Sequence, residues 1–331
     1  MLRWSGRSGS QGEGIAASIE RLIWTVRTGD MIDTVKTYIG VLSSFASAGT
    51  DADDNQAKAQ ALDDLANHIT RAAPGFAPLN NSGLVIQRLA KRVESGDPIL
   101  SESSLSRILQ CITDVFDKFL ATAVVQATKK CEEASYDTIA VHAWGSLTTR
   151  CASLIASSSR NPKILVFGAK ARDLAPKLRD LTKARVTVLP PLFSYQAAGM
   201  VEAVIFQAET ITPVSILARL GSAQVAESPL APSNLDIVAV TLSLAYQPRR
   251  GAVQSAYKRL PSASFRLEWQ ETIDVPLFDI IFMQNIRGNL NIIDEKGATK
   301  AKPAILRKKA LSIVKELEDL VEARCRVYEP S

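Results

Sequence analysis

The chain has 331 residues and a net charge of +5, and 46% of its residues are hydrophobic. This composition is typical of a soluble globular protein, and the length suggests about two domains. The protein is expected to be cytoplasmic. No stretch is long and apolar enough to span a membrane. The four cysteines have neither zinc nor redox spacing, which favours buried free thiols in a reducing compartment. The basic cluster after residue 300 is typical of a solvated helix face, so no direct nucleic-acid contact is expected.

Apolar residues recur at helical spacing over most of the first 130 residues. Residues 1–14 are rich in Gly, Ser and Arg and are expected to be a disordered lead. Asp30 follows Gly29 and is a plausible cap where the first helical run breaks. Helices are predicted over 14–48 with a break at Gly29-Asp30, over Ala57–Ile69, over Leu84–Val93, and from Ser103 or Ser104 to beyond Ala127. Residues 15–134 are therefore expected to form a helical domain that includes a long connecting helix.

After Ser135, short β-branched runs alternate with helical segments, a pattern that predicts a parallel sheet covered on both faces. Strands are predicted at Thr138–Val141, Ile164–Phe167, Val186–Leu189, Ala203–Phe206 and Ile237–Leu242, and Phe278–Met283 is a strand or a buried turn. Helices are predicted at Leu147–Ala156, Leu174–Leu181, Ser194–Met200, Val214–Ala226 and Pro303–Cys325. The sequence thus predicts an α/β fold in which residues 135–331 form a Rossmann-like domain.

Several segments of this second half carry a family resemblance by their order and spacing. They are Ile139-Ala140-Val141-His142-Ala143-Trp144, Ile164–Phe167, Val186–Leu189, Glu202–Glu209, Leu220-Gly221-Ser222, Asp274-Val275-Pro276 with Phe278-Asp279, and Arg287-Gly288. In these segments the chain resembles the alpha, beta and delta subunits of translation initiation factor 2B. It is also similar to the related ribose-1,5-bisphosphate and methylthioribose-1-phosphate isomerases. The resemblance covers roughly Ser104 to Gly288.

The resemblance implies an N-terminal all-helical domain joined by a long helix to a Rossmann-like parallel-sheet domain. It further implies a regulatory part of the guanine-nucleotide exchange machinery, without a cofactor. Such a subunit would form homo- or hetero-oligomers with related subunits and would contact the alpha subunit of initiation factor 2.

The isomerases' catalytic residues are replaced in this chain. They carry a Cys directly after the strand's His, where this sequence has Ala143. They need an Asp in a turn a few residues beyond Glu209, where 212–216 contain no carboxylate, and a further Asp is replaced by Pro190-Pro191. A thiol or a carboxylate can transfer a proton, whereas a methyl group cannot. These departures argue against isomerase chemistry and predict a chain without catalytic residues.

A candidate ligand pocket, the remnant of the isomerase site, remains at the ends of the predicted strands. It comprises His142, Trp144, Lys170, Arg172 and Glu209. His142 ends a strand, where ligands gather in open α/β sheets, but no Cys or carboxylate accompanies it in the motif, which is more typical of a structural histidine than of a general base. Trp144 can stack on a ligand or close the vacated pocket by packing.

Lys170 and Arg172 replace the family's phosphate-binding motif and keep positive charge where an anion could meet a helix N-terminus. Three hypotheses stay open at this point: a non-catalytic subunit, a sugar-phosphate isomerase with rearranged residues, and a sensor that binds a sugar phosphate or a nucleotide without turnover. A metal site is not expected, because there are two histidines and no ligand spacing.

Overall fold

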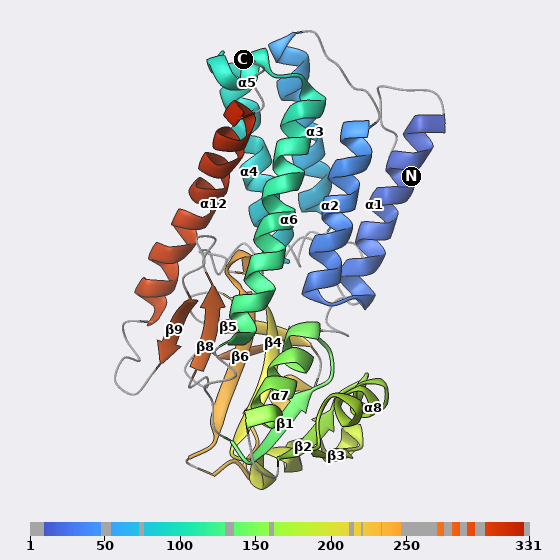
Figure 1. Ribbon diagram of the computed structural model, residues 1–331, viewed down its shortest axis with the longest axis vertical. Helices are drawn as coiled ribbons and strands as arrows, with labels where there is room; N and C mark the ends of the chain where they lie inside the picture. Colours follow the sequence, from blue (N-terminus) through green and yellow to red (C-terminus); the bar gives the residue numbers. More distant parts are fainter. Residues whose placement is uncertain are drawn as a thin grey trace. The chain divides into compact units, whose positions relative to one another are not determined.

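The computed structural model describes residues 10–47, 54–72, 76–129, 136–158, 162–211, 215–219, 221–232, 234–245, 270–274, 280–284, 290–294 and 302–327 (Figure 1). The chain divides into two compact units, one formed by residues 1–121 with 311–331 and the other by residues 122–310. The unit boundaries fall inside two helices, α6 (Leu105–Lys129) and α12 (Lys302–Val327).

The first unit is helical, as the sequence predicts. Besides its parts of α6 and α12 it contains α1 (Ser10–Thr28), α2 (Met31–Ser47), α3 (Asn55–Ala72), α4 (Ala77–Glu94) and α5 (Pro98–Glu102). The break between α1 and α2 is confirmed, and Asp30 Oδ1 accepts a hydrogen bond from the Asp33 amide at 2.7 Å, which satisfies a free donor of the first turn. Tyr38 and Phe116 meet edge to face in the core, with ring centroids 5.4 Å apart.

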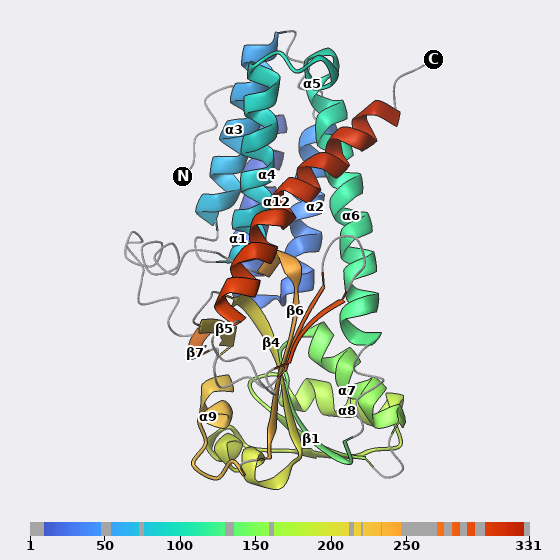
Figure 2. The same cartoon turned by 90° about the vertical axis from the view of Figure 1, so that its left-hand side faces the viewer.

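The structure near both ends of the chain differs from the domain limits expected from the sequence. Helix α1 begins at Ser10, inside the segment expected to be a lead, and residues 1–9 lie outside the described part of the chain. The limit expected at 134/135 gave the whole C-terminal tail to the sheet domain, but residues from Leu311 onward belong to the helical unit. There α12 lies against α4 and α6 (Figure 2). In this part α12 buries Leu317 and Val321 and makes ion pairs with both helices, which no local pattern indicates.

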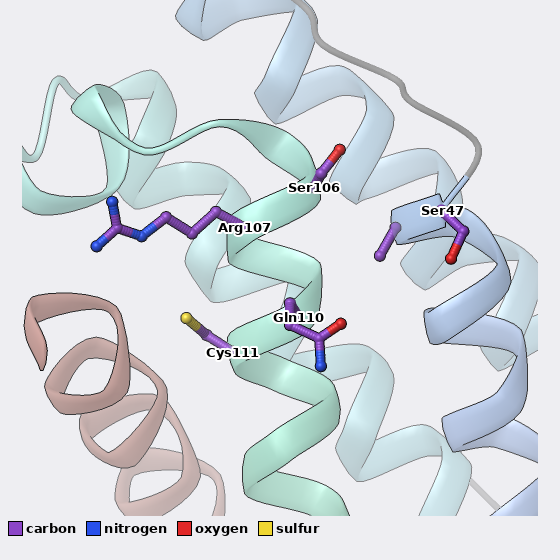
Figure 3. A pocket seen from close by; sticks show the side chains of 6 residues that line it. Ser47, Ser106, Arg107, Gln110 and Cys111 are labelled. Atoms are coloured by element: carbon purple, nitrogen blue, oxygen red, sulfur yellow. The ribbon is translucent and has the colours of Figure 1, made fainter. Parts of the chain in front are cut away.

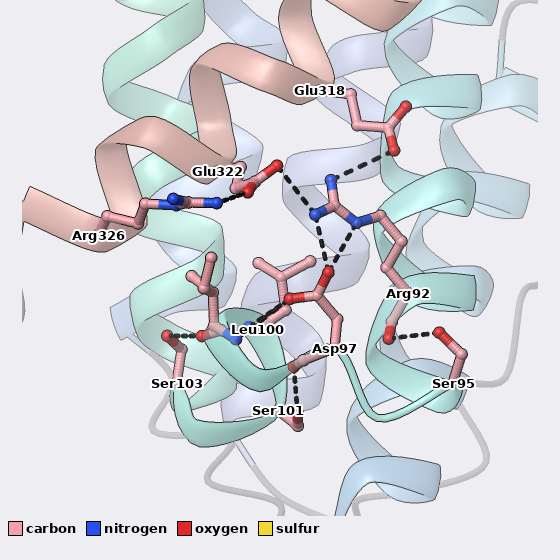
Figure 4. A network of polar contacts seen from close by, with 10 residues as sticks. Arg92, Ser95, Asp97, Leu100, Ser101, Ser103, Glu318, Glu322 and Arg326 are labelled. Carbon is pink, nitrogen blue, oxygen red and sulfur yellow. Dashed lines mark hydrogen bonds and ion pairs between the residues drawn. The ribbon is translucent and has the colours of Figure 1, made fainter.

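Arg92 of α4 is the centre of one such group of ion pairs. Its guanidinium lies 2.8 Å from Asp97, 3.4 Å from Glu318 and 2.9 Å from Glu322 (Figure 4). Asp97 also caps α5, because its Oδ1 accepts from the amides of Ile99 and Leu100. The network therefore joins α4, α5 and α12.

The second unit is a mainly parallel sheet with the strand order β3-β2-β1-β4-β6-β8-β9. The strands on this path are β1 (Thr138–His142), β2 (Lys163–Phe167), β3 (Arg185–Val188), β4 (Ala203–Ile211), β6 (Asp236–Leu242), β8 (Ile280–Gln284) and β9 (Leu290–Asp294). All neighbours on the path are parallel except β8 and β9. Every residue of β4 is buried, as expected for a central parallel strand.

Helical segments of the second unit separate the strands. They are α7 (Ser146–Ser158), α8 (Ala171–Leu181), the 3-10 helices η2 (Pro191–Met200) and η3 (Ser243–Ala245), and α9 (Ser222–Ala226). The predicted α/β alternation is confirmed. Of the stretch Phe278–Met283, predicted as a strand or a buried turn, the described residues from Ile280 onward belong to strand β8 (Ile280–Gln284). Residues 212–214, 275–279 and 285–289, which include the turn after Glu209 and parts of the matched C-terminal segments, lie outside the described residues, as do the side chains of the basic cluster after residue 300.

The helix predicted over Val214–Ala226 is wrong for its first half. Residues Ser215–Arg219 form strand β5, which pairs antiparallel with β4 and with β7 (Gln270–Asp274). Among the described residues of this stretch, the helix is confined to Ser222–Ala226 and follows Gly221, which has φ +97°. A short apolar run fits a strand or a helix equally well by periodicity, and here two neighbouring strands supply the backbone partners.

Two of the cysteines are buried free thiols, as predicted: Cys111 and Cys325. Cys151 is disulfide-bonded, which corrects the expectation for that residue. Cys131 lies outside the described residues.

Candidate functional site

The candidate site lies at the carboxyl ends of β1, β2 and β4, where parallel strands open toward their following loops. His142 is the last residue of β1 and is 1% exposed. Its ring packs against Phe167 and Phe206, with centroids 5.2 Å and 6.3 Å away. Ser222 Oγ lies 3.4 Å from His142 Nδ1. The imidazole is therefore enclosed by aromatic rings and one hydroxyl.

Gly168, the residue after β2, makes this close packing possible. Its φ is +95°, and a Cβ there would lie 2.8 Å from both Cδ2 and Nε2 of His142. The loop after β2 thus passes directly over the imidazole. Any side chain at this position would displace the ring, because real Cβ atoms do not approach other atoms so closely.

Trp144 lies in the turn after β1 with two cations over its ring. Lys170 Nζ is 4.4 Å and Arg219 Cζ is 4.6 Å from the ring centroid. The quadrupole of an indole attracts cations at these distances. Both basic groups are therefore held by the protein's own aromatic ring. The indole Nε1 is buried and has no hydrogen-bond partner.

Glu209 and Arg219 form a buried ion pair across the β4–β5 hairpin. Arg219 Nε donates to Glu209 Oε1 at 2.5 Å. The Arg219 side chain is 3% exposed and the Glu209 side chain is fully buried. Two opposite charges that are removed from water together are compatible with burial, whereas either alone is not. The Glu209 carboxylate is therefore neutralised by Arg219 of the same chain.

Gln207 of β4 places an amide against the turn after β1. The residue is 2% exposed, and neither its Nε2 nor its Oε1 has a hydrogen-bond partner. Its amide occupies the space beside Gly145, where an added Cβ would overlap it. Buried amides are normally hydrogen-bonded, so this pair of unsatisfied atoms is unusual.

The structure brings four of the five predicted pocket residues to this edge: His142, Trp144, Lys170 and Glu209. Arg172 is exposed on the first turn of α8 and does not join them. Sequence reasoning missed Arg219, Gln207 and Ser222. Arg219 was hidden inside a segment predicted to be helical, and Gln207 lay in a matched strand without any signal of its own.

The described residues contain no group of three or more His, Cys, Asp or Glu side chains placed to hold a metal ion. None of the helices among them combines the length and hydropathy that a membrane span requires.

Comparison with known proteins gives structural matches only. No family model and no curated protein matches the sequence. The chain is similar to the crystal structure of eIF2B delta from Chaetomium thermophilum, with 14% identity and a TM-score of 0.64 over 83% of this chain and 98% of that chain. It is also similar to the tetrameric eIF2B-beta2-delta2 complex from the same organism, with 16% identity, a TM-score of 0.62 and coverage of 83% and 93%.

A third structure, the translation initiation factor eIF-2B from Pyrococcus horikoshii OT3, has 12% identity and a TM-score of 0.58 over 81% of this chain and 94% of that chain. The chain therefore has the fold of these proteins. The resemblance stated from the sequence is confirmed at the level of the fold.

Proposed function

We propose that this chain is a non-catalytic regulatory or assembly subunit of the initiation factor 2B alpha/beta/delta type. The shared fold, which extends over four-fifths of the chain, and the ordered sequence segments both support this proposal. On this reading the chain acts in the cytoplasm, as part of the machinery that exchanges guanine nucleotides on initiation factor 2.

The observation that carries the proposal is that the strand-end site is filled by the chain's own groups. General acid–base catalysis needs a side chain that can exchange a proton with a bound substrate. Here Glu209 is paired with Arg219, Trp144 is covered by two cations, and Ala143 occupies the position of the isomerases' cysteine. His142 is enclosed by Phe167 and Phe206. This arrangement favours a structural site over an enzymatic one.

The proposed partners are related subunits and the alpha subunit of initiation factor 2. One similar structure is a tetrameric complex of beta and delta subunits, which supports assembly through a common fold. Native mass spectrometry of the purified chain tests this, alone and mixed with related subunits, and biolayer interferometry tests binding to immobilised initiation factor 2 alpha subunit. We expect an oligomer and measurable binding. A chain that stays monomeric and binds neither partner would overturn the proposal.

A second candidate function, a sugar-phosphate or nucleotide sensor without turnover, is favoured by one observation. The Gln207 amide and the Trp144 indole nitrogen are buried without protein partners, and Lys170 Nζ lies over the Trp144 ring. Ligand hydroxyl groups would satisfy such atoms. Isothermal titration calorimetry with ribose phosphates and nucleoside monophosphates tests this. A sensor predicts micromolar binding that Lys170→Ala weakens, while the matched variant Arg172→Ala binds normally.

Turnover assays separate both candidates from the isomerase hypothesis. We expect no conversion of ribose 1,5-bisphosphate or methylthioribose 1-phosphate by the purified chain. Conversion that is abolished by His142→Asn would restore an enzymatic function and exclude both non-catalytic readings.

A further inference from the structure

Two buried thiols of the helical unit face each other from helices that are far apart in the sequence. Cys111 belongs to α6 and Cys325 to α12, both are free, and they are 0% and 1% exposed. Figure 3 shows the Cys111 sulfur on the side of α6 that faces α12. Each thiol is the neighbour with the largest effect on the pKa of the other. The site described at the strand ends uses neither of them.

Polar contacts on both sides of Cys111 fix the two helices against each other. One turn before it, Arg107 Nη2 donates to the carbonyl oxygen of Cys325 at 2.9 Å. About one turn after it, Asp114 accepts from Arg324 at 2.8 Å. Residues at these helical spacings share one face, so Cys111 lies between two anchored contacts. The facing position of Cys325 is thereby set by backbone as well as by side-chain bonds.

The surroundings make the two thiols unequal. The hydrogen bond from Cys325 lowers the pKa of Cys111, and Arg107 and Arg324 lower it further, against the opposing effects of burial and of Asp114. The same hydrogen bond and burial raise the pKa of Cys325. The thiolate is the reactive form of cysteine, so this inequality favours Cys111 over Cys325 as the nucleophile of the pair.

Cys111 also lines a cavity of about 330 Å³. The other lining residues come from the end of α2 and the start of α6: Ala46, Ser47, Ser106, Arg107 and Gln110 (Figure 3). A cavity of this size holds on the order of ten water molecules. A molecule as small as hydrogen peroxide therefore fits beside the sulfur, although the thiol is not exposed at the protein surface.

We propose that Cys111 and Cys325 form a reversible oxidation site, in which peroxide oxidises Cys111 and Cys325 then closes a disulfide between α6 and α12. In the first step the Cys111 sulfur attacks one peroxide oxygen and the O–O bond breaks. The leaving hydroxide takes up the thiol proton as water, and Cys111 becomes a sulfenic acid. In the second step the Cys325 sulfur attacks the Cys111 sulfur, and the sulfenic oxygen leaves with the Cys325 proton as a second water. Two electrons pass from the thiols to the peroxide.

The product links α12 covalently to α6 within the helical unit. Disulfide exchange with a dithiol reductant returns both cysteines to thiols. This inference is independent of the proposed function, because it uses no residue of the strand-end site.

The experiment treats the full-length chain with hydrogen peroxide, blocks remaining thiols by alkylation and identifies cross-linked peptides by mass spectrometry. We expect a linked Cys111–Cys325 peptide that accumulates with peroxide and disappears after dithiothreitol. Absence of this peptide from folded, oxidised protein would overturn the proposal. Cys151, which is already disulfide-bonded, has no free thiol and should not change when peroxide is added.

Two matched variants test the order of the steps. In Cys325→Ser the sulfenic acid of Cys111 has no partner thiol, so a sulfenic-acid probe such as dimedone should label Cys111 strongly. In Cys111→Ser the probe should leave Cys325 unlabelled. Circular dichroism verifies that both variants fold. Preferential labelling of Cys325 would contradict the assignment of Cys111 as the nucleophile.

A cavity variant tests the route of the oxidant. Ala46→Leu narrows the cavity without touching either thiol, and we expect it to slow formation of the linked peptide several-fold. An unchanged rate would contradict peroxide entry through this cavity.

Discussion

Arg219 Nε donates to Glu209 Oε1 at 2.5 Å inside a site where both side chains are almost fully removed from water. The same guanidinium lies over the Trp144 ring. One arginine thus neutralises the carboxylate and covers the indole. Together these contacts occupy the strand-end edge of the sheet, where an enzyme of this architecture would hold its substrate.

Replacing Arg219 with Met should destabilise the chain by about 3–5 kcal/mol, because it leaves Glu209 buried without a counter-charge. The double variant Arg219→Met with Glu209→Leu removes both charges and should recover most of the loss. Urea unfolding followed by circular dichroism measures both. A single variant as stable as the parent would mean that water reaches Glu209.

Replacing Gln207 with Met should stabilise the chain by roughly 1–3 kcal/mol, because the buried amide has no hydrogen-bond partner to lose. The control is Thr241→Val, whose hydroxyl donates to the Ala208 carbonyl at 2.8 Å and whose loss should cost about 1 kcal/mol. Thermal unfolding compares the two. A destabilised Gln207→Met variant would indicate that the amide binds a group from solution.

Gly168→Ala should destabilise the chain by about 1–3 kcal/mol, since the residue has a positive φ and its Cβ would press on the His142 ring. Gly40→Ala is the matched control: nothing lies within 4 Å of a Cβ there, and the residue is inside α2, so alanine should stabilise slightly. Differential scanning calorimetry checks both shifts. If Gly168→Ala and Gly40→Ala shifted the melting temperature equally, the close contact between Gly168 and the His142 ring would be contradicted.

The helical unit should become less stable as the pH is lowered, because the carboxylates around Arg92 then become protonated. Burial alone would raise the pKa of Asp97, but Arg92 outweighs it and the pKa is lowered. Hydrogen bonds from Arg92 and Arg326 lower the pKa of Glu322. Carboxyls with lowered folded-state pKa values stabilise fully above their unfolded pKa of about 4 and lose this stabilisation as the pH falls below it.

Melting temperatures from pH 7 to pH 3 test this behaviour. Arg92→Met should lower the melting temperature at pH 7 and flatten its decline in acid. Arg88→Met, which removes a half-exposed ion pair with Glu318, should change little. Parallel curves for Arg92→Met and the parent would show that the network does not couple to pH.

Much of the fold follows from local pattern. The break before Asp30, the long helix α6 and the alternation of strands and helices after Ser135 were all predicted, because apolar periodicity and capping act within a few residues. The same is true of His142 at the end of β1 and of the small residue that follows it. These features are determined by residues that are close to one another in the sequence.

The sequence by itself determined the α/β architecture and the position of His142 at the end of a strand. Only the tertiary structure decided that Ser215–Arg219 is a strand, that the end of α12 packs with the helical unit, and that Glu209 is paired with Arg219. These outcomes depend on hydrogen bonds and charge pairs between distant segments. Their energies come from contacts that no local pattern contains.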